Sequence, residues 1–482
     1  MVSVYSYYVH FFVYTICYTV LEDESVRLKI YERMRDMKGF EKIIGYGSVK
    51  KELEQISDVL KNREVYAKLG VKPPRGLLLH GVPGVGKSLM ASELIEASGL
   101  NAFVCRKDKP NGEFVNEIKS TFEKAAKNAP SIVFLDDMDK FANGDERHPD
   151  AEEYVTVQSC IDETKSKDVF VIATANNLLC LPYSLLRSGR FDRQIYVDTP
   201  TISDAEQIIA YYLSDKNVSS ELDINSIAKI MLNHSCAALE TVINEAGMYA
   251  GYDRAECITM NYFMKAAMHS LFNVPYSVLN NPDIFDKNDT TLMKIAYHEA
   301  GHAVIHEVLD PDSITIVSAY SNTNNTGGFT SFCNNEITDP YDRVQLEIIA
   351  SLAGKAAVEQ KLCCIDIGPS EDLQRAFRRV RKLVVDNCVC GFNLYGGSRE
   401  YSNDLMAHQE QVIADEIEKY YRIAKGIITQ NDELLEAIAT ALIEKKFLSG
   451  KDIRDIRSKC KIVRAGSLNR LRYKSTPIRD NT

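Results

Sequence analysis

The chain has 482 residues, enough for two to four domains of ordinary size. Hydrophobic residues make up 45% of it and charged residues 26%, which excludes a mostly disordered or fibrous protein. The net charge of −10 gives no general attraction to DNA or RNA, so we expect no nucleic-acid partner. Twelve cysteines without a CxxC pair do not make a disulfide scaffold and favour a reducing compartment.

The N-terminal segment, residues 1–21, is predicted to be a single-pass membrane anchor. Residues 2–21 carry no formal charge and are about long enough to cross ~30 Å of hydrocarbon. A buried N-terminal segment is the alternative. Because no basic residue precedes the segment, the positive-inside rule places the bulk of the chain on the cytoplasmic or matrix side of the membrane. The catalytic domains are expected in the cytoplasm or in the mitochondrial matrix or intermembrane space, with the organelle left open.

The remaining chain divides by pattern. Residues 22–38 form a charged linker, and residues 39–200 alternate short apolar runs with helical patterns, which predicts an α/β domain with a parallel sheet. Residues 201–280 are predicted to be a helical lid that ends at a hinge marked by Pro275, Asn280 and Pro282. Residues 281–450 are mostly helical, and residues 451–482 form a basic tail.

A phosphate-binding loop follows the apolar run at residues 76–80 and opens a helical pattern. This strand–loop–helix context is the one that a GxxxxGK[ST] motif requires, and it indicates ATP and Mg²⁺ as ligands. Glycines let backbone N–H groups surround phosphates, the lysine pairs with phosphate oxygens, and the serine hydroxyl reaches Mg²⁺. The motif consists of Gly81, Val82, Pro83, Gly84, Val85, Gly86, Lys87 and Ser88.

Polar residues at the ends of two further apolar runs complete this candidate site. Residues 132–135 end in Asp136, a candidate Mg²⁺ ligand, and Asp137, a candidate for polarising the attacking water. Residues 171–175 end in Asn176, whose amide can reach the γ-phosphate or that water. Downstream, Arg187 and Arg190 have the side chain suited to stabilising phosphate charge, with a surface ion-pair cluster as the alternative.

A second candidate site is the HExxH motif at residues 298–302. Residues four apart lie on one face of a helix, so His298 and His302 can bind the same Zn²⁺ ion, and Glu299 can act as the general base. His306, one turn further, gives poor tetrahedral geometry as a third ligand. Spacing alone leaves four candidates for that ligand, namely Glu347, Glu359, Glu371 and Asp372.

The order of these motifs is more specific than any one of them. From about residue 39 to residue 456 the chain resembles the FtsH family of membrane-anchored AAA+ zinc metalloproteases, which includes the mitochondrial AAA proteases. Besides the motifs, the resemblance includes the segments at residues 72–79, 185–193, 297–303 and 434–439. It implies a P-loop AAA+ ATPase domain with a helical lid, followed by a mostly α-helical zinc metallopeptidase domain.

The resemblance also implies residue roles and partners. Asp372 corresponds to the family's third zinc ligand, Asn176 to sensor 1, and Arg187 and Arg190 to arginine fingers that complete a neighbouring subunit's ATP site. The family forms hexameric rings, so a homo- or hetero-hexamer is expected. Family members use ATP to unfold membrane and soluble proteins before cleaving them, so the expected partners are protein substrates and a membrane.

Three departures from the family pattern concern the ATPase domain. Asp137 stands where the family has glutamate, Cys236-Ala237 replaces a Gly-Ala pair in the lid, and Pro110-Asn111-Gly112 replaces the pore aromatic motif Phe-Val-Gly, with Phe114 as a possible substitute. Because the peptidase motif is intact, an ATP-dependent zinc endopeptidase is the main hypothesis. The alternative is a divergent ring subunit with impaired ATPase or no proteolysis that acts as an adaptor or regulator.

Overall fold

The computed structural model describes residue 37 and residues 39–142, 151–279, 290–320, 327–333, 340–365, 370–395 and 403–464. The predicted anchor at residues 1–21, nearly all of the linker and the tail beyond residue 464 lie outside these residues. No helix within the described ranges combines the length and apolar character needed to cross a membrane. The chain divides into two compact units between Ala266 and Ala267, inside α11 (Met260–Ser270). The boundary between lid and peptidase domain that the sequence suggests near residue 280 stays a prediction.

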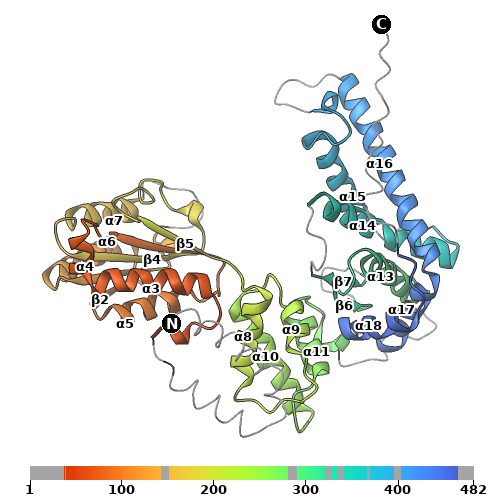
Figure 1. Ribbon diagram of the computed structural model, residues 1–482, viewed down its shortest axis with the longest axis horizontal. Helices are drawn as coiled ribbons and strands as arrows, with labels where there is room; N and C mark the ends of the chain where they lie inside the picture. The colour runs from red at the N-terminus through yellow and green to blue at the C-terminus, as the bar shows by residue number, and fades with distance from the viewer. Residues whose placement is uncertain are drawn as a thin grey trace. The chain divides into compact units, whose positions relative to one another are not determined.

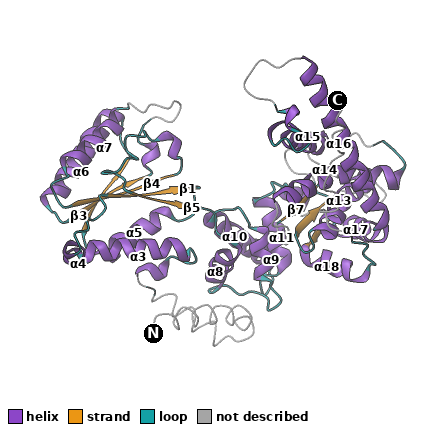
Figure 2. Cartoon of the chain, turned by 45° about the horizontal axis from the view of Figure 1, so that its top comes forward, coloured by secondary structure: helices purple, strands orange, loops and turns teal. Residues whose placement is uncertain are grey.

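The first unit is built on a parallel five-stranded sheet with the order β2-β3-β4-β1-β5. Figure 2 shows α6 and α7 on one face of this sheet and α3 and α5 on the other. β1, β3 and β4 are almost completely buried, as expected for central strands covered by helices on both faces. The strands are β1 (Gly76–Gly81), β2 (Asn101–Arg106), β3 (Ser131–Asp136), β4 (Val169–Ala175) and β5 (Arg193–Val197).

Helices complete the first unit. One group surrounds the sheet: α3 (Gly47–Lys61), α4 (Arg63–Lys68), α5 (Lys87–Ser98), α6 (Asn111–Lys127) and α7 (Glu152–Glu163). A second group follows the sheet: α8 (Ile202–Leu213), α9 (Ile224–Ile230), α10 (Cys236–Tyr252) and α11. Side-chain caps begin three of the second group, with Thr201 and Asp204 forming a capping box on α8, Asp223 capping α9 and Ser235 capping α10.

The second unit is mostly helical, as the sequence predicts for residues 281–450 (Figure 1). Its helices are α12 (Tyr276–Leu279), α13 (Thr290–Leu309), α14 (Pro340–Leu362), α15 (Ser370–Arg381), α16 (Asn403–Gln430), α17 (Asp432–Lys445) and α18 (Gly450–Lys459). A small antiparallel sheet of order β7-β6-β8 consists of β7 (Phe329–Phe332), β6 (Ile314–Ser318) and β8 (Phe447–Ser449).

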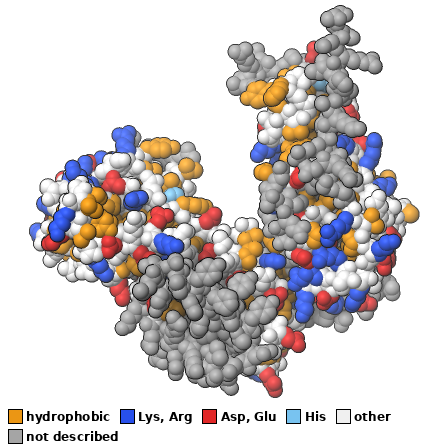
Figure 3. All heavy atoms as spheres, viewed as in Figure 1, with side chains coloured by type: hydrophobic (Ala, Val, Ile, Leu, Met, Phe, Trp, Pro, Cys, Tyr) orange, Lys and Arg blue, Asp and Glu red, His pale blue; other side chains and the backbone are white. Residues whose placement is uncertain are grey.

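Helix α13 lies in the core of the second unit, against α14, α17 and β6. Small residues allow its close approach to α14, because a Cβ added at Gly301 would lie 2.7 Å from the carbonyl oxygen of Ala353 and 2.8 Å from the Cβ of Ala357. On the visible face of the described residues, acidic and basic side chains are interspersed (Figure 3).

Candidate functional site

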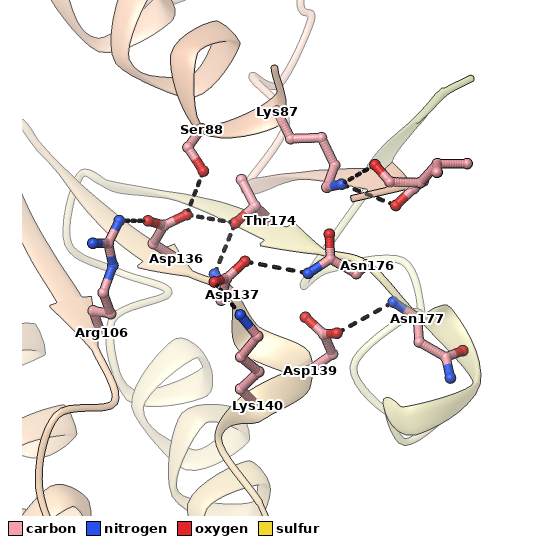
Figure 4. A network of polar contacts seen from close by, with 12 residues as sticks. Lys87, Ser88, Arg106, Asp136, Asp137, Asp139, Lys140, Thr174, Asn176 and Asn177 are labelled. Atoms are coloured by element: carbon pink, nitrogen blue, oxygen red, sulfur yellow. Dashed lines mark hydrogen bonds and ion pairs between the residues drawn. The ribbon is translucent and has the colours of Figure 1, made fainter. Parts of the chain in front are cut away.

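The loop between β1 and α5 has a backbone that glycine alone tolerates. A Cβ added at Gly81 would lie 2.0 Å from the carbonyl oxygen of Val197, and Gly86 has a φ of 96°. Lys87 folds back over the loop and donates from Nζ to the carbonyl oxygens of Gly81, at 2.9 Å, and Val82, at 2.7 Å (Figure 4). Burial lowers the pKa of Lys87, and the neighbouring carboxylates oppose that shift.

The carboxylate of Asp136 lies at the centre of a polar network at the carboxyl end of β3 (Figure 4). Its Oδ1 accepts hydrogen bonds from Ser88 Oγ at 2.8 Å and Thr174 Oγ1 at 2.7 Å, and its Oδ2 contacts the Arg106 guanidinium. Burial alone would raise the pKa of Asp136, but the hydrogen bonds from these three side chains outweigh it and hold the pKa below its usual value. Ser88 and Asp136, expected to hold Mg²⁺ together, are therefore adjacent.

Asp137 and Asn176 also lie next to each other. Asn176 Nδ2 donates to Asp137 Oδ1 at 3.4 Å, and Lys140 Nζ is 2.7 Å from Asp137 Oδ2. The backbone N–H of Asp137 donates to Thr174 Oγ1 at 2.8 Å, which ties the turn after β3 to β4. The roles of both partners were missed from the sequence: that of Thr174 depends on which strand is adjacent, and that of Lys140 on the turn after β3, which brings it back to Asp137 three residues earlier.

The two arginines expected to act on a neighbouring subunit differ in their surroundings. Arg190 is engaged within its own domain, where it donates to Gln158 Oε1 at 3.0 Å and pairs with Asp162 Oδ2 at 2.8 Å. Hydrogen bonds from Arg190 and Lys165 lower the pKa of Asp162 to about 2. Arg187 is exposed. The geometry thus leaves Arg187 accessible and makes Arg190 part of the fold.

Phe114 is not a substitute for the pore aromatic. Its side chain is fully buried and packs edge-on against Phe141, with ring centroids 4.8 Å apart. Its position in the first turn of α6, under Lys107 and facing the sheet, directs the ring into the core. The suggestion from the sequence was therefore wrong, because alignment with the family's motif does not show which side chains of α6 face the core.

The lid residue Cys236 lies beside the phosphate-binding loop. Its Sγ is 3.4 Å from Tyr46 Oη and 3.7 Å from the carbonyl oxygen of Val85. The next residue, Ala237, donates its backbone N–H to the carbonyl oxygen of Gly84 at 3.0 Å. Cys236 therefore fits where the family pattern has glycine, with its side chain packed between the loop and Tyr46.

In the second unit, His298 and His302 on α13 meet Asp372 on α15. The two Nε2 atoms are 3.0 Å apart, and Asp372 Oδ2 is 3.0 Å from that of His298 and 3.3 Å from that of His302. His302 Nδ1 is 2.7 Å from the carbonyl oxygen of Ala350, a contact that fixes its ring and directs Nε2 toward the other two groups. Hydrogen bonds from the histidines hold the pKa of Asp372 below its usual value although burial opposes them.

These three donors fit a zinc ion. Bonds of about 2.0–2.2 Å at tetrahedral angles separate ligand atoms by roughly 3.3–3.6 Å. The three atoms here are 3.0–3.3 Å apart, so only a slight spreading is needed to admit the ion. Within the described residues this is the one group of three such side chains whose ligand atoms converge, all within 4.8 Å of one another. Gly354 on α14 provides the space, because a Cβ there would lie 2.4 Å from the His298 ring.

The other candidates for a third ligand have different partners. Glu347 pairs with Arg379 at 2.7 Å, Glu359 accepts from Tyr421 Oη at 2.5 Å, and Glu371 is exposed. His306 is buried against the Phe332 ring, with centroids 4.0 Å apart, and burial lowers its pKa to about 3. Of the four acids that spacing left open, Asp372 is the one that meets both histidines.

Glu299 is buried beside this group and is held by β7. Its Oε2 accepts a hydrogen bond from Thr330 Oγ1 at 2.8 Å. Gly328 leaves room for the side chain, because a Cβ there would lie 2.9 Å from Glu299 Cγ. Thr330, Gly328 and Gly354 carry no sequence signal of their own, since each matters only through packing against α13.

Comparison with known proteins agrees with both sites. Residues 77–199 match the ATPase family associated with various cellular activities (AAA), and residues 286–456 match peptidase family M41. The chain is 28% identical to the "ATP-dependent zinc metalloprotease FtsH" of Caldicellulosiruptor bescii, over 89% of this chain and 74% of the relative. It is 30% identical to the protein of that name from Mycoplasma genitalium, over 88% of this chain and 63% of the relative.

The fold and the two matches define a chain in which an AAA ATPase domain precedes a metallopeptidase domain of family M41. A further relative, "ATP-dependent zinc metalloprotease FtsH 3" of Symbiobacterium thermophilum, is 28% identical over 91% of this chain and 74% of its own length. Over most of its length the chain is therefore similar to FtsH-type ATP-dependent zinc metalloproteases, with the AAA and M41 domains in the same chain.

Proposed function

We propose that the chain is an ATP-dependent zinc endopeptidase that unfolds membrane or soluble proteins and cleaves them. The observation that carries the proposal is the convergence of His298, His302 and Asp372 beside the buried carboxylate of Glu299. The ligand spacing and the M41 match support zinc as the ion. When bound, zinc polarises a carbonyl and lowers the pKa of a bound water toward ~7.

Glu299 acts in this proposal as the general base. Its carboxylate follows His298 directly on α13 and is oriented by Thr330, so it can take a proton at Oε1 while Oε2 keeps its hydrogen bond. The small residues between α13 and α14 keep both histidines fixed on one rigid helix. The chain's own contribution is therefore a preorganised base and a preorganised ligand set.

ATP and Mg²⁺ bind at the loop from Gly81 to Ser88. Lys87 is placed to exchange its loop carbonyls for phosphate oxygens, and Ser88 and Asp136 are the proposed Mg²⁺ ligands. Asp137 and Asn176, in contact with each other, are proposed to orient the attacking water. The match of residues 77–199 to the AAA family supports these roles.

The assembly and location belong to the same proposal. Exposed Arg187 is suited to act on the ATP site of a neighbouring subunit in a hexamer, homo- or heteromeric, with Arg190 supporting its segment. Residues 1–21 are proposed to anchor the chain in a membrane, with both catalytic domains on one side. A non-proteolytic ring subunit is less well supported, because every group of the candidate zinc site is in place.

One experiment on the purified full chain tests the peptidase. Zinc per chain and cleavage of an unfolded casein-type substrate are measured with ATP, with and without a chelator. We expect one zinc per chain, cleavage that stops with the chelator, and loss of cleavage in Glu299→Gln. Glu418→Gln, which changes an exposed carboxylate on α16, is the matched control and keeps full activity. Bound zinc without cleavage at any ATP concentration would instead support the adaptor hypothesis.

A further inference from the structure

An arginine that no motif includes lies at the Mg²⁺ end of the nucleotide site. Arg106 is the last residue of β2, and the register of the parallel pair places it directly opposite Asp136 on β3. The carboxyl ends of parallel strands share one edge of the sheet, so the position follows from the backbone. From there the guanidinium contacts Asp136 Oδ2 (Figure 4).

Arg106 contacts Oδ2 of Asp136, the carboxylate oxygen to which Ser88 and Thr174 do not bond. Asp136 is 1% exposed, and its Oδ1 already accepts from Ser88 and Thr174. A buried carboxylate without a counter-charge is costly, and Arg106 supplies that charge. The arginine side chain is itself 65% exposed, so it can leave without breaking any core packing.

We propose that Arg106 is a positioning residue that competes with Mg²⁺ for Asp136 and so sets the Mg²⁺ concentration at which the site loads nucleotide. The proposal rests on the nucleotide site proposed above. In the metal-free state Arg106 neutralises Asp136 and keeps its side chain in place. When Mg²⁺–nucleotide binds, the guanidinium releases Oδ2, and the energy of that broken ion pair is subtracted from the Mg²⁺ affinity.

If Arg106 competes with Mg²⁺, replacing it should change nucleotide binding in the opposite direction from replacing an arginine that binds phosphate. Replacing a phosphate-binding arginine weakens nucleotide binding at every Mg²⁺ concentration. Replacing a competitor lowers the Mg²⁺ concentration needed for half-maximal binding and does not strengthen binding when Mg²⁺ is absent. The two roles are therefore separated by one titration.

The test is a Mg²⁺ titration of fluorescent ATP-analogue binding to the full chain. In Arg106→Gln the half-saturating Mg²⁺ concentration should fall about threefold to tenfold, the range expected when one partly exposed ion pair no longer competes. Arg106→Lys, which keeps the charge, should stay within about twofold of the parent. With EDTA present, Arg106→Gln should bind the analogue no more tightly than the parent chain.

Lys109→Gln is the matched control, because it removes one positive charge from the same domain, where Lys109 pairs with Glu117 rather than with Asp136. An unchanged or increased half-saturating Mg²⁺ concentration in Arg106→Gln would overturn the inference. An equal fall in Lys109→Gln would also overturn it, by assigning the effect to net charge. If the parent chain binds no analogue at any Mg²⁺ concentration, the proposed nucleotide site itself is wrong.

Discussion

Hydroxyl groups orient the carboxylates of both candidate sites. Thr174 bonds to Asp136 in the first unit, and Thr330 bonds to Glu299 in the second. Each threonine lies on a strand beside the element that carries the acid. A one-dimensional pattern does not show these partners, because the sequence separation is 38 residues in one pair and 31 in the other.

The contact of Thr330 with Glu299 leads to a prediction for catalysis. Thr330→Val removes the hydroxyl at nearly constant volume, so Glu299 loses a charge-assisted hydrogen bond and its fixed orientation. We expect kcat for peptide cleavage to fall about tenfold with little change in KM. Thr330→Ser, which restores the hydroxyl, should recover most of the rate, and zinc content should match the parent in both variants. Equal losses in the two variants would contradict this role.

At the scale of elements, an ion-pair cluster attaches α18 to α13. Arg457 on α18 contacts Glu307 at 2.5 Å and Asp312 at 2.8 Å. Glu307 is 2% exposed, and burial raises its pKa above the usual value despite Arg457. Arg457 therefore compensates the buried charge of Glu307, which would otherwise carry the cost of desolvation without a partner.

Removing Arg457 should destabilise the fold in a pH-dependent way. Arg457→Ala leaves the Glu307 carboxylate unpaired, and we expect a loss of about 3 kcal/mol in the free energy of unfolding near pH 8. Because Glu307 binds its proton more tightly folded than unfolded, stability recovers as the pH falls through its raised pKa, and the loss should be smaller near pH 5. Urea unfolding at both pH values measures this, with exposed Lys459→Ala as control. A loss independent of pH would contradict the role of Glu307.

The elements found from the sequence are those with strong local signals. β1, β3 and β4 were predicted because they are continuous apolar runs that end at motif residues. β2 and β5 were missed, since each is a largely exposed edge strand whose apolar run, residues 102–105 in β2 and 195–197 in β5, is short and carries no motif residue at its end. The α13 histidines follow from helical spacing, whereas Asp372 required the family resemblance, because its distance from them in the chain carries no geometric information.

At the scale of the whole molecule, the two arginines of residues 185–193 should behave differently. Arg187→Ala should abolish most ATP hydrolysis without changing the melting temperature, since Arg187 is exposed. Arg190→Ala should lower both, because it removes the partner of Gln158 and leaves Asp162 with Lys165 alone. ATPase rates and thermal melts of the two variants measure this difference. A lower melting temperature in Arg187→Ala would contradict it.

Mixing two inactive variants tests whether Arg187 acts on the ATP site of a neighbouring subunit. Arg187→Ala keeps its own phosphate-binding loop, whereas Lys87→Ala keeps the arginine but cannot hold nucleotide. If Arg187 completes a neighbour's site, a mixture of the two inactive variants should regain ATP hydrolysis. No recovery over a range of mixing ratios, with assembly verified, would assign Arg187 to its own subunit.

The hydroxyl of Thr174 has a consequence that reaches across the sheet. It donates to Asp136 and accepts from the backbone N–H of Asp137, and two residues later β4 leads into Asn176. Asn176 also contacts Asp137 directly at 3.4 Å, so this end of β4 is connected to Asp137 by two hydrogen bonds and to Asp136 through the hydroxyl of Thr174. With the roles proposed above for Asp136 and Asp137, a displacement of this end of β4 would disturb the Mg²⁺ ligand and the water-orienting acid at once.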